Sequence, residues 1–169
     1  VAYFFGREIH NELKVPVGLI QATWEGTPAE AWTSNDILKS DVNLQIYLHR
    51  FREKVFRTRP GICPFDQSAP SALFNGMIAP VKPFGIRGVI WYQGESNVTD
   101  PGLYELIFPS MIRDWRTVWG EVGFPFYYVQ IAPFDYEIPL SGAAIRDAAG
   151  RRRSAAGSRL FSASSCPSA

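Results

Sequence analysis

Cysteine and histidine are scarce in this chain of 169 residues. The two cysteines, Cys63 and Cys166, are too few for a disulfide scaffold, and no CxxC pair or Cys/His cluster indicates a structural zinc site. The two histidines, His10 and His49, have no acidic neighbour at a spacing that indicates a Ser–His–Asp triad. We therefore expect a protein that needs neither disulfides nor a bound metal or cofactor.

Long apolar runs are also absent. The chain has no stretch of about 18 apolar residues, so we expect no membrane span. Residues 1–13 mix apolar and charged side chains, unlike the basic start and apolar block of a signal peptide. The first residue is valine instead of methionine, so this pattern leaves the cellular compartment open.

Most of the chain carries no large excess of positive or negative charge. The formal net charge is +1, but four arginines stand among the last 19 residues, which contain no acidic residue. Without these arginines the net charge is about −3, which argues against the basic surface typical of nucleic-acid binding. Apolar residues make up 46% of the sequence, enough for the core of one domain.

Helix-like and strand-like patterns alternate along most of the chain, which predicts an α/β fold with a parallel sheet covered on both faces. Thr27 is expected to cap a short helix whose first residue is Pro28, and Pro109 is expected to divide the last helix. A loop is expected over 59–70. The expected strands cover 15–24, 88–92 and 126–131, and the longer helices cover 1–13, 36–57 and 100–119.

The end of the chain has a different composition. From Arg151 to Ala169, 14 of 19 residues are Arg, Ser or Ala, and no helix or strand periodicity remains. We interpret residues 148–169 as a disordered or non-native tail, such as a frameshifted end, and residues 1–147 as the domain.

Two polar clusters follow predicted strands. In the first, the amide of Gln93 can direct an N–H at a developing oxyanion, and Glu95 can hold neighbouring groups in place. In the second, Gly26 can offer a backbone N–H at the start of a helix. Both fall at carboxyl ends of strands, where open parallel sheets bind their ligands. Each cluster also has a plainer interpretation. The Gln93 cluster can be a polar turn with a helix cap, and Gly26 can be needed only for its turn.

Several stretches resemble the sialate O-acetylesterase family of SGNH/GDSL-type hydrolases. The resemblance covers about residues 1–147, and its most specific part is the combination of Trp91–Asn97 with Asn75–Pro80. It implies a three-layer α/β/α fold with a parallel, flavodoxin-like sheet, of which this chain carries part. It also implies hydrolysis of acetyl esters on sugars or glycans, in a family whose members are often secreted, periplasmic or lysosomal. The matching stretches are Val15–Ile20, Gly26–Trp32, Leu73–Pro80, Gly88–Asn97, Asp114–Arg116 with Trp119–Gly120, and Pro125–Phe134.

The resemblance implies roles for individual residues. Such enzymes use a Ser–His–Asp arrangement without a metal ion, and their oxyanion hole combines N–H donors from the serine, a glycine and an Asn or Gln side chain. The glycine matches Gly26, the amide matches Gln93, and Glu95 supports the same motif. The positions expected to lie near or contact the substrate are Asn75, Gly76, Trp91 and Tyr92.

Two departures from the family concern its nucleophile and its base. Nothing in this chain resembles the family's Gly-Gln-Ser-Asn turn or its Asp-x-x-His segment. Ser96 does not replace them, because a nucleophile elbow needs glycine at position 98, which is valine. We therefore expect part of an esterase that is inactive by itself. The alternatives are a non-catalytic carbohydrate-binding module, with Trp32, Trp91 and Tyr92 as stacking surfaces, or a pseudoenzyme without a stable function.

Overall fold

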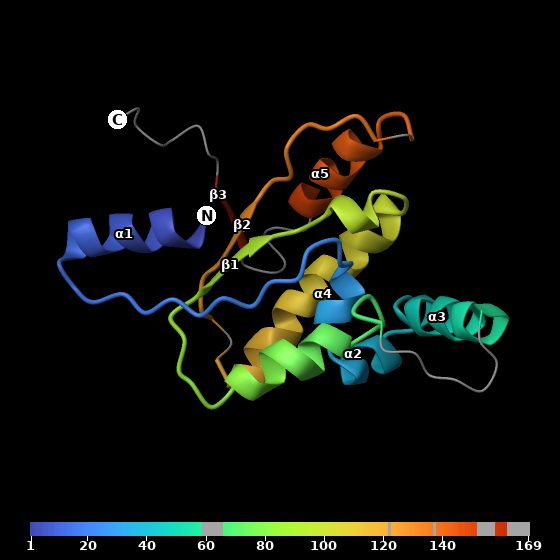
Figure 1. Ribbon diagram of the computed structural model, residues 1–169, viewed down its shortest axis with the longest axis horizontal. Helices are drawn as coiled ribbons and strands as arrows, with labels where there is room; N and C mark the ends of the chain where they lie inside the picture. Colours follow the sequence, from blue (N-terminus) through green and yellow to red (C-terminus); the bar gives the residue numbers. More distant parts are fainter. Residues whose placement is uncertain (59–65, 122, 137, 152–157, 162–169) are drawn as a thin grey trace.

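The computed structural model describes residues 1–58, 66–121, 123–136, 138–151 and 158–161 (Figure 1). Both cysteines lie outside these ranges. No helix within them is long and apolar enough to span a bilayer. The helical elements, with 3-10 and π turns marked η, are α1 (Ala2–Leu13), η1 (Ala29–Trp32), α2 (Asn35–Ser40), α3 (Gln45–Thr58), η2 (Phe74–Ile78), η3 (Ala79–Val81), η4 (Glu95–Asn97), α4 (Pro101–Trp119) and α5 (Ser141–Arg151). The strands are β1 (Val89–Tyr92), β2 (Phe126–Val129) and β3 (Ser158–Phe161).

The three strands form one parallel sheet in the order β1-β2-β3. Val89 stands opposite Phe126 in the register, and Phe126 stands opposite Ser158. Successive side chains of a strand point to opposite faces, so Trp91, Phe126 and Tyr128 share one face, and all three are buried. The sequence-based prediction of an α/β fold with a parallel sheet is confirmed.

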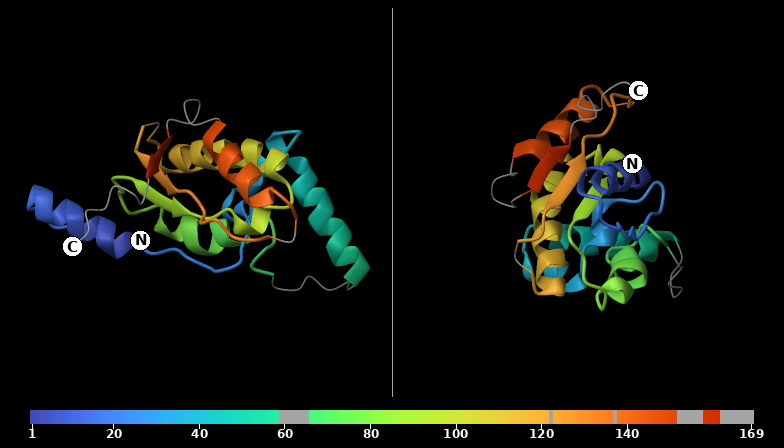
Figure 2. Two further views of the ribbon diagram at one scale, coloured as in Figure 1. Left: turned by 90° about the horizontal axis from the view of Figure 1, so that it is seen from above. Right: turned by 90° about the vertical axis from the view of Figure 1, so that its left-hand side faces the viewer.

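Helices lie on both faces of this sheet (Figure 2). On one face, the ring of Phe108 in α4 lies 6.1 Å from that of Phe126 and 5.4 Å from that of Tyr128, between ring centroids. On the other face, the ring of Phe5 in α1 lies 6.0 Å from that of Tyr127. The order helix, sheet, helix therefore gives three layers, although α1 projects well beyond the sheet.

The longest helix, α4, is continuous, and the predicted break at Pro109 is wrong. Asp100 caps the helix by accepting a hydrogen bond from Leu103 N at 3.2 Å, and Pro101 follows as its first residue. Gly120 ends it in the left-handed conformation, with φ of 67°. Proline removes one backbone donor, and the burial of one helix face against the sheet is enough to keep the helix intact.

The Asp114–Arg116 motif near the end of α4 binds this helix to the end of η1 and to the residues just after it. The carboxylate of Asp114 accepts hydrogen bonds from Ser34 N at 2.7 Å and Ser34 Oγ at 2.8 Å. Trp115 Nε1 donates to Trp32 O at 2.9 Å. All four residues are buried, so this motif has a structural role in the described part of the chain.

The prediction of a buried strand over 15–24 is wrong. The segment is extended but pairs with no strand, and Leu19, Ile20 and Trp24 are each about half exposed. An apolar run becomes a buried strand only when a neighbouring strand takes up its backbone hydrogen bonds. Within the described residues, β1 has β2 as its single strand neighbour.

The helix predicted over 36–57 is divided into α2 and α3. Asp41 ends α2 because its carboxylate accepts the Asn43 N–H at 2.9 Å, a local turn that competes with helix continuation. Leu44 then lies between the two helices as a fully buried anchor, as its apolar position predicted. The helix over 1–13 and the strands near 88–92 and 126–131 are confirmed with small shifts of their ends.

The expected tail over residues 148–169 is described only in part. Helix α5 continues to Arg151, across the expected boundary at residue 147, and Ser158–Phe161 form β3 beside β2. Residues 152–157 and 162–169 lie outside the described residues, as do residues 59–65 of the predicted loop. The division of the chain into a domain and a tail therefore stays a prediction.

Replacement of Asp114 tests the link between α4 and the segment after η1. Asp114→Ala leaves two buried donors of Ser34 without an acceptor, so we expect the free energy of unfolding to fall by about 2 to 3 kcal/mol. Asp114→Asn keeps one acceptor and is expected to cost less. Urea denaturation measures both, with exposed Asp135→Ala as the matched control. Equal stability of Asp114→Ala and Asp135→Ala would contradict the structural role of Asp114.

Candidate functional site

The two polar clusters meet at the carboxyl end of β1. Gln93 is the first residue after this strand, and its side chain reaches back to the turn that precedes η1. There its Nε2 donates a hydrogen bond to Thr27 O at 3.2 Å. The structure thus places the Gln93 carboxamide directly beside the residue that follows Gly26.

The side chain of Asn97 joins the two clusters. Its Oδ1 accepts hydrogen bonds from Ala29 N at 2.9 Å and from Gln93 Nε2 at 2.7 Å. Its Nδ2 donates to Glu30 Oε2 at 3.0 Å. Asn97 is only 6% exposed, so these bonds are made away from water, where unpaired polar groups are costly. The plainer sequence-based interpretation, a polar turn with Asn97 or Ser96 as a helix cap, missed its role as a bridge.

Asn97 and Thr27 together determine how the Gln93 side-chain amide is oriented. The acceptor Oδ1 of Asn97 and the carbonyl of Thr27 both need a donor, so the Gln93 NH₂ group faces them and both of its hydrogens are used. The other end of the amide, Gln93 Oε1, is buried without a hydrogen-bond partner. Gln93 is therefore next to the predicted oxyanion position, with its donors directed into the protein in this conformation.

The turn at Gly26 has the backbone geometry that glycine supplies. Its φ is 69°, in the left-handed region, and no atom lies within 4 Å of the place where a Cβ would stand. The predicted capping by Thr27 is wrong: η1 begins at Ala29, and Thr27 Oγ1 instead donates to Trp24 O at 2.7 Å and accepts from Trp32 Nε1 at 3.0 Å. These bonds hold the turn while one side of Gly26 stays open.

Glu95 lies outside this network. Its side chain is exposed and has no hydrogen bond to the residues that the structure describes. The carboxyl group that joins the network belongs to half-buried Glu30, which sequence reasoning placed only at the start of a short helix. Burial raises the pKa of Glu30 above its ordinary value, although its own backbone and the Asn97 amide oppose the shift by hydrogen bonding.

Asn75 and Gly76 lie in η2, and both are exposed. A residue just before η2 is hydrogen-bonded to the site, because Ser71 N donates to Glu30 O at 2.9 Å. The structure therefore connects the Asn-Gly-Met-Ile segment to the site through the backbone of η1, and Asn75 makes no side-chain hydrogen bond to the residues that the structure describes.

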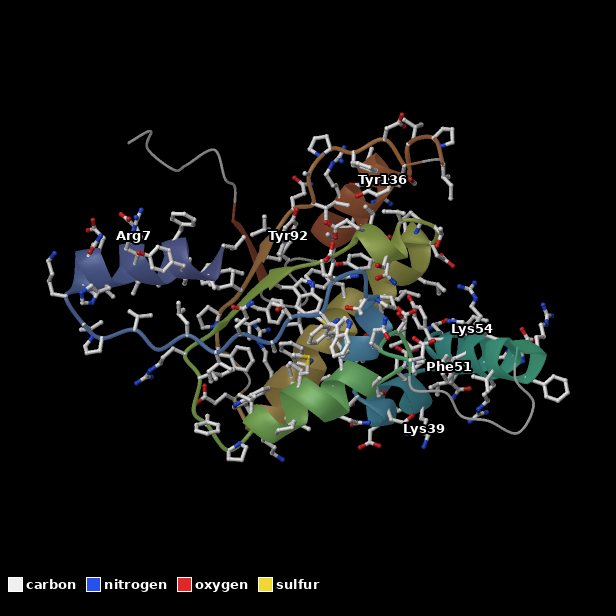
Figure 3. All side chains as sticks on the ribbon, in the orientation of Figure 1. Arg7, Lys39, Phe51, Lys54, Tyr92 and Tyr136 are labelled. Atoms are coloured by element: carbon white, nitrogen blue, oxygen red, sulfur yellow. The ribbon has the colours of Figure 1, made fainter. Side chains whose placement is uncertain are left out.

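The two aromatic residues predicted to contact a sugar have opposite surroundings. Trp91 is 7% exposed, and its ring lies 5.9 Å from Trp32 and 5.7 Å from Trp115, between centroids. Trp91 is therefore part of the core and leaves no ring face for a ligand. Tyr92 points to the other face of the sheet and is 50% exposed (Figure 3).

Neither histidine reaches this site with a hydrogen bond. His10 Nδ1 contacts Val15 O at 2.7 Å near the end of α1, and His49 lies exposed on α3 with Nδ1 3.9 Å from Glu53 Oε2. Ser96 is exposed and makes no hydrogen bond with either ring within the described residues. The same part of the chain holds no group of three His, Cys, Asp or Glu side chains that could bind a metal ion.

Comparison with known proteins places the fold and the paired motifs in a family of carbohydrate esterases. Residues 1–158 match the family described as carbohydrate esterase, sialic acid-specific acetylesterase, and the chain belongs to this family. The resemblance inferred from the motifs is thereby confirmed.

Named relatives support this membership. The chain is 37% identical over 144 residues to human sialate O-acetylesterase, covering 78% of this chain and 25% of that protein. It is 32% identical over 171 residues to the rat sialate O-acetylesterase, covering 82% and 31%. A crystal structure of a carbohydrate acetylesterase from Xanthomonas citri superposes with a TM-score of 0.71 at 30% identity, over 94% of this chain and 33% of that one.

These coverages show that the chain spans only a quarter to a third of the length of the proteins it matches. The structural likeness to the Xanthomonas enzyme confirms the predicted fold class, an SGNH-type α/β fold of which this chain forms part.

Replacing Glu30 with glutamine should change how stability depends on pH. The folded-state pKa of Glu30 is raised, so its favourable contribution is fully present below the ordinary value of 4.5 and is lost as pH rises through the raised pKa. Glutamine can accept the same bond from Asn97 but does not titrate. On lowering the pH from neutral to about 5, we expect the wild-type chain to gain stability relative to Glu30→Gln, as measured by urea unfolding.

Glu95→Gln is the matched control, because Glu95 is exposed. Its stability should follow the wild-type profile at every pH. A Glu30→Gln profile that also runs parallel to the wild type would show that burial does not raise the pKa of Glu30.

Proposed function

We propose that the protein containing this chain hydrolyses acetyl esters on carbohydrates, and that this chain supplies the oxyanion side of the active site. The observation that carries the proposal is the contact between the two motifs: Gln93 Nε2 lies 3.2 Å from Thr27 O, beside the open turn at Gly26. A backbone N–H and a carboxamide brought to one place, in a family of carbohydrate esterases, can receive the negative charge of a tetrahedral intermediate.

In the proposed mechanism a serine attacks the acetyl carbonyl, and a histidine takes its proton and later returns it to the sugar oxygen. Gly26 N–H and the Gln93 amide hold the oxygen that becomes negative. For this task the Gln93 amide turns so that one Nε2 hydrogen leaves Thr27 O, the longer of its two bonds, while the 2.7 Å bond to Asn97 Oδ1 is kept. The serine and histidine come from outside this chain, so the chain alone does not turn over esters.

Asn97 and Glu30 act in this proposal as positioning residues. Asn97 Oδ1 holds Gln93 near the reacting oxygen, and Asn97 Nδ2 is fixed in turn by Glu30 Oε2. This chemistry needs no cofactor, and acetylated sugars or glycans are its substrates.

A non-catalytic carbohydrate-binding module receives less support. That alternative relied on Trp32, Trp91 and Tyr92 as stacking surfaces, and two of these rings are buried in the core. Of these three rings only that of Tyr92 is exposed, which is little for a stacking platform.

Gln93→Ala in the longer natural protein tests the proposal. We expect kcat for acetate release from an acetylated sugar to fall about 100- to 1000-fold, with little change in KM, because the lost donor acts mainly in the transition state. Gln45→Ala, an exposed glutamine at the start of α3, is the matched control and should leave kcat unchanged. This chain alone should release acetate at the rate of the buffer.

Two results would contradict the proposal. One is a Gln93→Ala enzyme with unchanged kcat. The other is hydrolysis by this chain alone that Ser96→Ala abolishes, because the nucleophile would then lie within the chain.

A further inference from the structure

A pocket of about 230 Å³ with both polar and apolar walls lies next to Asn97, and Gln93 is not part of its lining. Its walls come from η1, from α3, from the residues just before Ser71 and from the turn around η4. It lies beyond the carboxyl end of β1, where parallel sheets bind ligands. It is smaller than the roughly 300 to 1,000 Å³ of pockets for drug-sized ligands, so it suits a ligand of about one ring.

The side chains around this pocket offer both hydrogen-bond donors and acceptors. The hydroxyl of Tyr47 belongs to a side chain that is 6% exposed, and it has no hydrogen-bond partner among the described residues. The carboxyl group of Glu30 also lines the pocket, and its Oε2 accepts from Asn97. Ser96 adds a hydroxyl at the rim. Sugar hydroxyls both donate and accept, which matches this mixture.

Phe51 gives the same pocket one aromatic wall. It lies on α3 one turn from Tyr47 and next to Lys54 (Figure 3). A ring beside several polar groups is the composition expected for a small-ligand site.

The two cations around the pocket are paired within the protein. Arg50 Nη1 lies 3.1 Å from Asp100 Oδ2, and Lys54 Nζ lies 3.0 Å from Asp66 Oδ2. Neither cation is therefore a dedicated partner for an anionic ligand. The balance favours a neutral group rich in hydroxyls over a carboxylate or a phosphate.

We propose that this pocket binds the vicinal hydroxyls of a neutral part of the sugar whose acetyl ester is hydrolysed beside Gln93. The assignment rests on the proposed function, since it takes the ligand to be the sugar of the substrate. Asn97 lies between the two places, because it bonds Gln93 on one side and lines the pocket on the other.

The surroundings of Tyr47 support this geometry. Burial first, and then the nearby carboxyl groups of Glu30 and Asp100, raise the pKa of Tyr47 far above its ordinary value. The hydroxyl therefore keeps its proton and can donate to a sugar oxygen at any physiological pH.

NMR titration of this chain with methyl β-galactopyranoside, a neutral sugar without an acetyl group, tests the assignment. We expect saturable binding, with shifted amide signals around Arg50 and Ser96. Tyr47→Phe removes one hydroxyl that has no partner in the fold, so affinity should fall about fivefold, the loss of one hydrogen bond, without loss of structure. Ser96→Ala should weaken binding in the same direction.

Tyr3→Phe on the exposed face of α1 is the matched control and should bind the sugar as the wild type does. Galacturonic acid, which adds a carboxylate to the same ring, should bind no better than the neutral sugar. The assignment is overturned by an absence of saturable binding, by equal affinity of Tyr47→Phe and wild type, or by tighter, salt-sensitive binding of galacturonic acid.

The longer protein separates this inference from the proposed function. If it hydrolyses acetylated sugars and Tyr47→Phe leaves KM unchanged, the pocket assignment fails and the esterase proposal stands. If Tyr47→Phe weakens sugar binding but the longer protein releases no acetate, the pocket assignment stands and the esterase proposal fails.

Discussion

The side-chain amide of Asn97 is the interaction on which the rest of the site depends. It bonds to Ala29 N, which is 68 positions away in the sequence, and also to Gln93 and Glu30. An amide suits this place because it accepts at one end and donates at the other, so it can satisfy two N–H donors and one carboxylate at once. The position of Gln93 beside Gly26 follows from this arrangement, because Gln93 is anchored by the same oxygen.

Core packing holds in place the segments that Asn97 connects. The indole of Trp91 fills the space between β1 and α4, against Trp32 and Trp115, and the last of these donates to the carbonyl of Trp32. The segment that carries η1 is therefore fixed to α4 by packing and by the Asp114 bonds. Residues that are part of the family's motifs thus divide into two groups: those that build the core, and those that face the site.

Sequence reasoning predicted the parallel sheet and placed Gln93 at the carboxyl end of β1, because both rest on local rules. The strand expected before Gly26 does not form among the described residues, so the same rule did not place that cluster. Short apolar runs between helices indicate parallel strands, and polar residues at their carboxyl ends gather at one edge. The alternation of side chains along β1 and β2 could also have placed Trp91 with Phe126 in the core.

The remaining features depend on contacts that a sequence does not display. The run over 15–24 is apolar enough for a buried strand, but burial requires a neighbouring strand, and none pairs with it among the described residues. The direction of the Gln93 amide is set by Asn97 and Thr27, which lie close only in three dimensions. Glu30 differs from exposed Glu95 in its burial and in its hydrogen bond from Asn97, although both stand in family motifs.

The bridge at Asn97 is tested most directly by exchanging its hydrogen-bonding partners in a double-mutant cycle. Asn97→Asp keeps the acceptor for Ala29 and Gln93 but sets a second carboxyl against Glu30, so the free energy of unfolding should fall. Adding Glu30→Gln restores a donor facing that carboxylate, and the double variant should be more stable than Asn97→Asp alone, with a coupling of about 1 to 2 kcal/mol. Strictly additive effects of the two substitutions would contradict a direct bond between residues 97 and 30, and with it the account of the site.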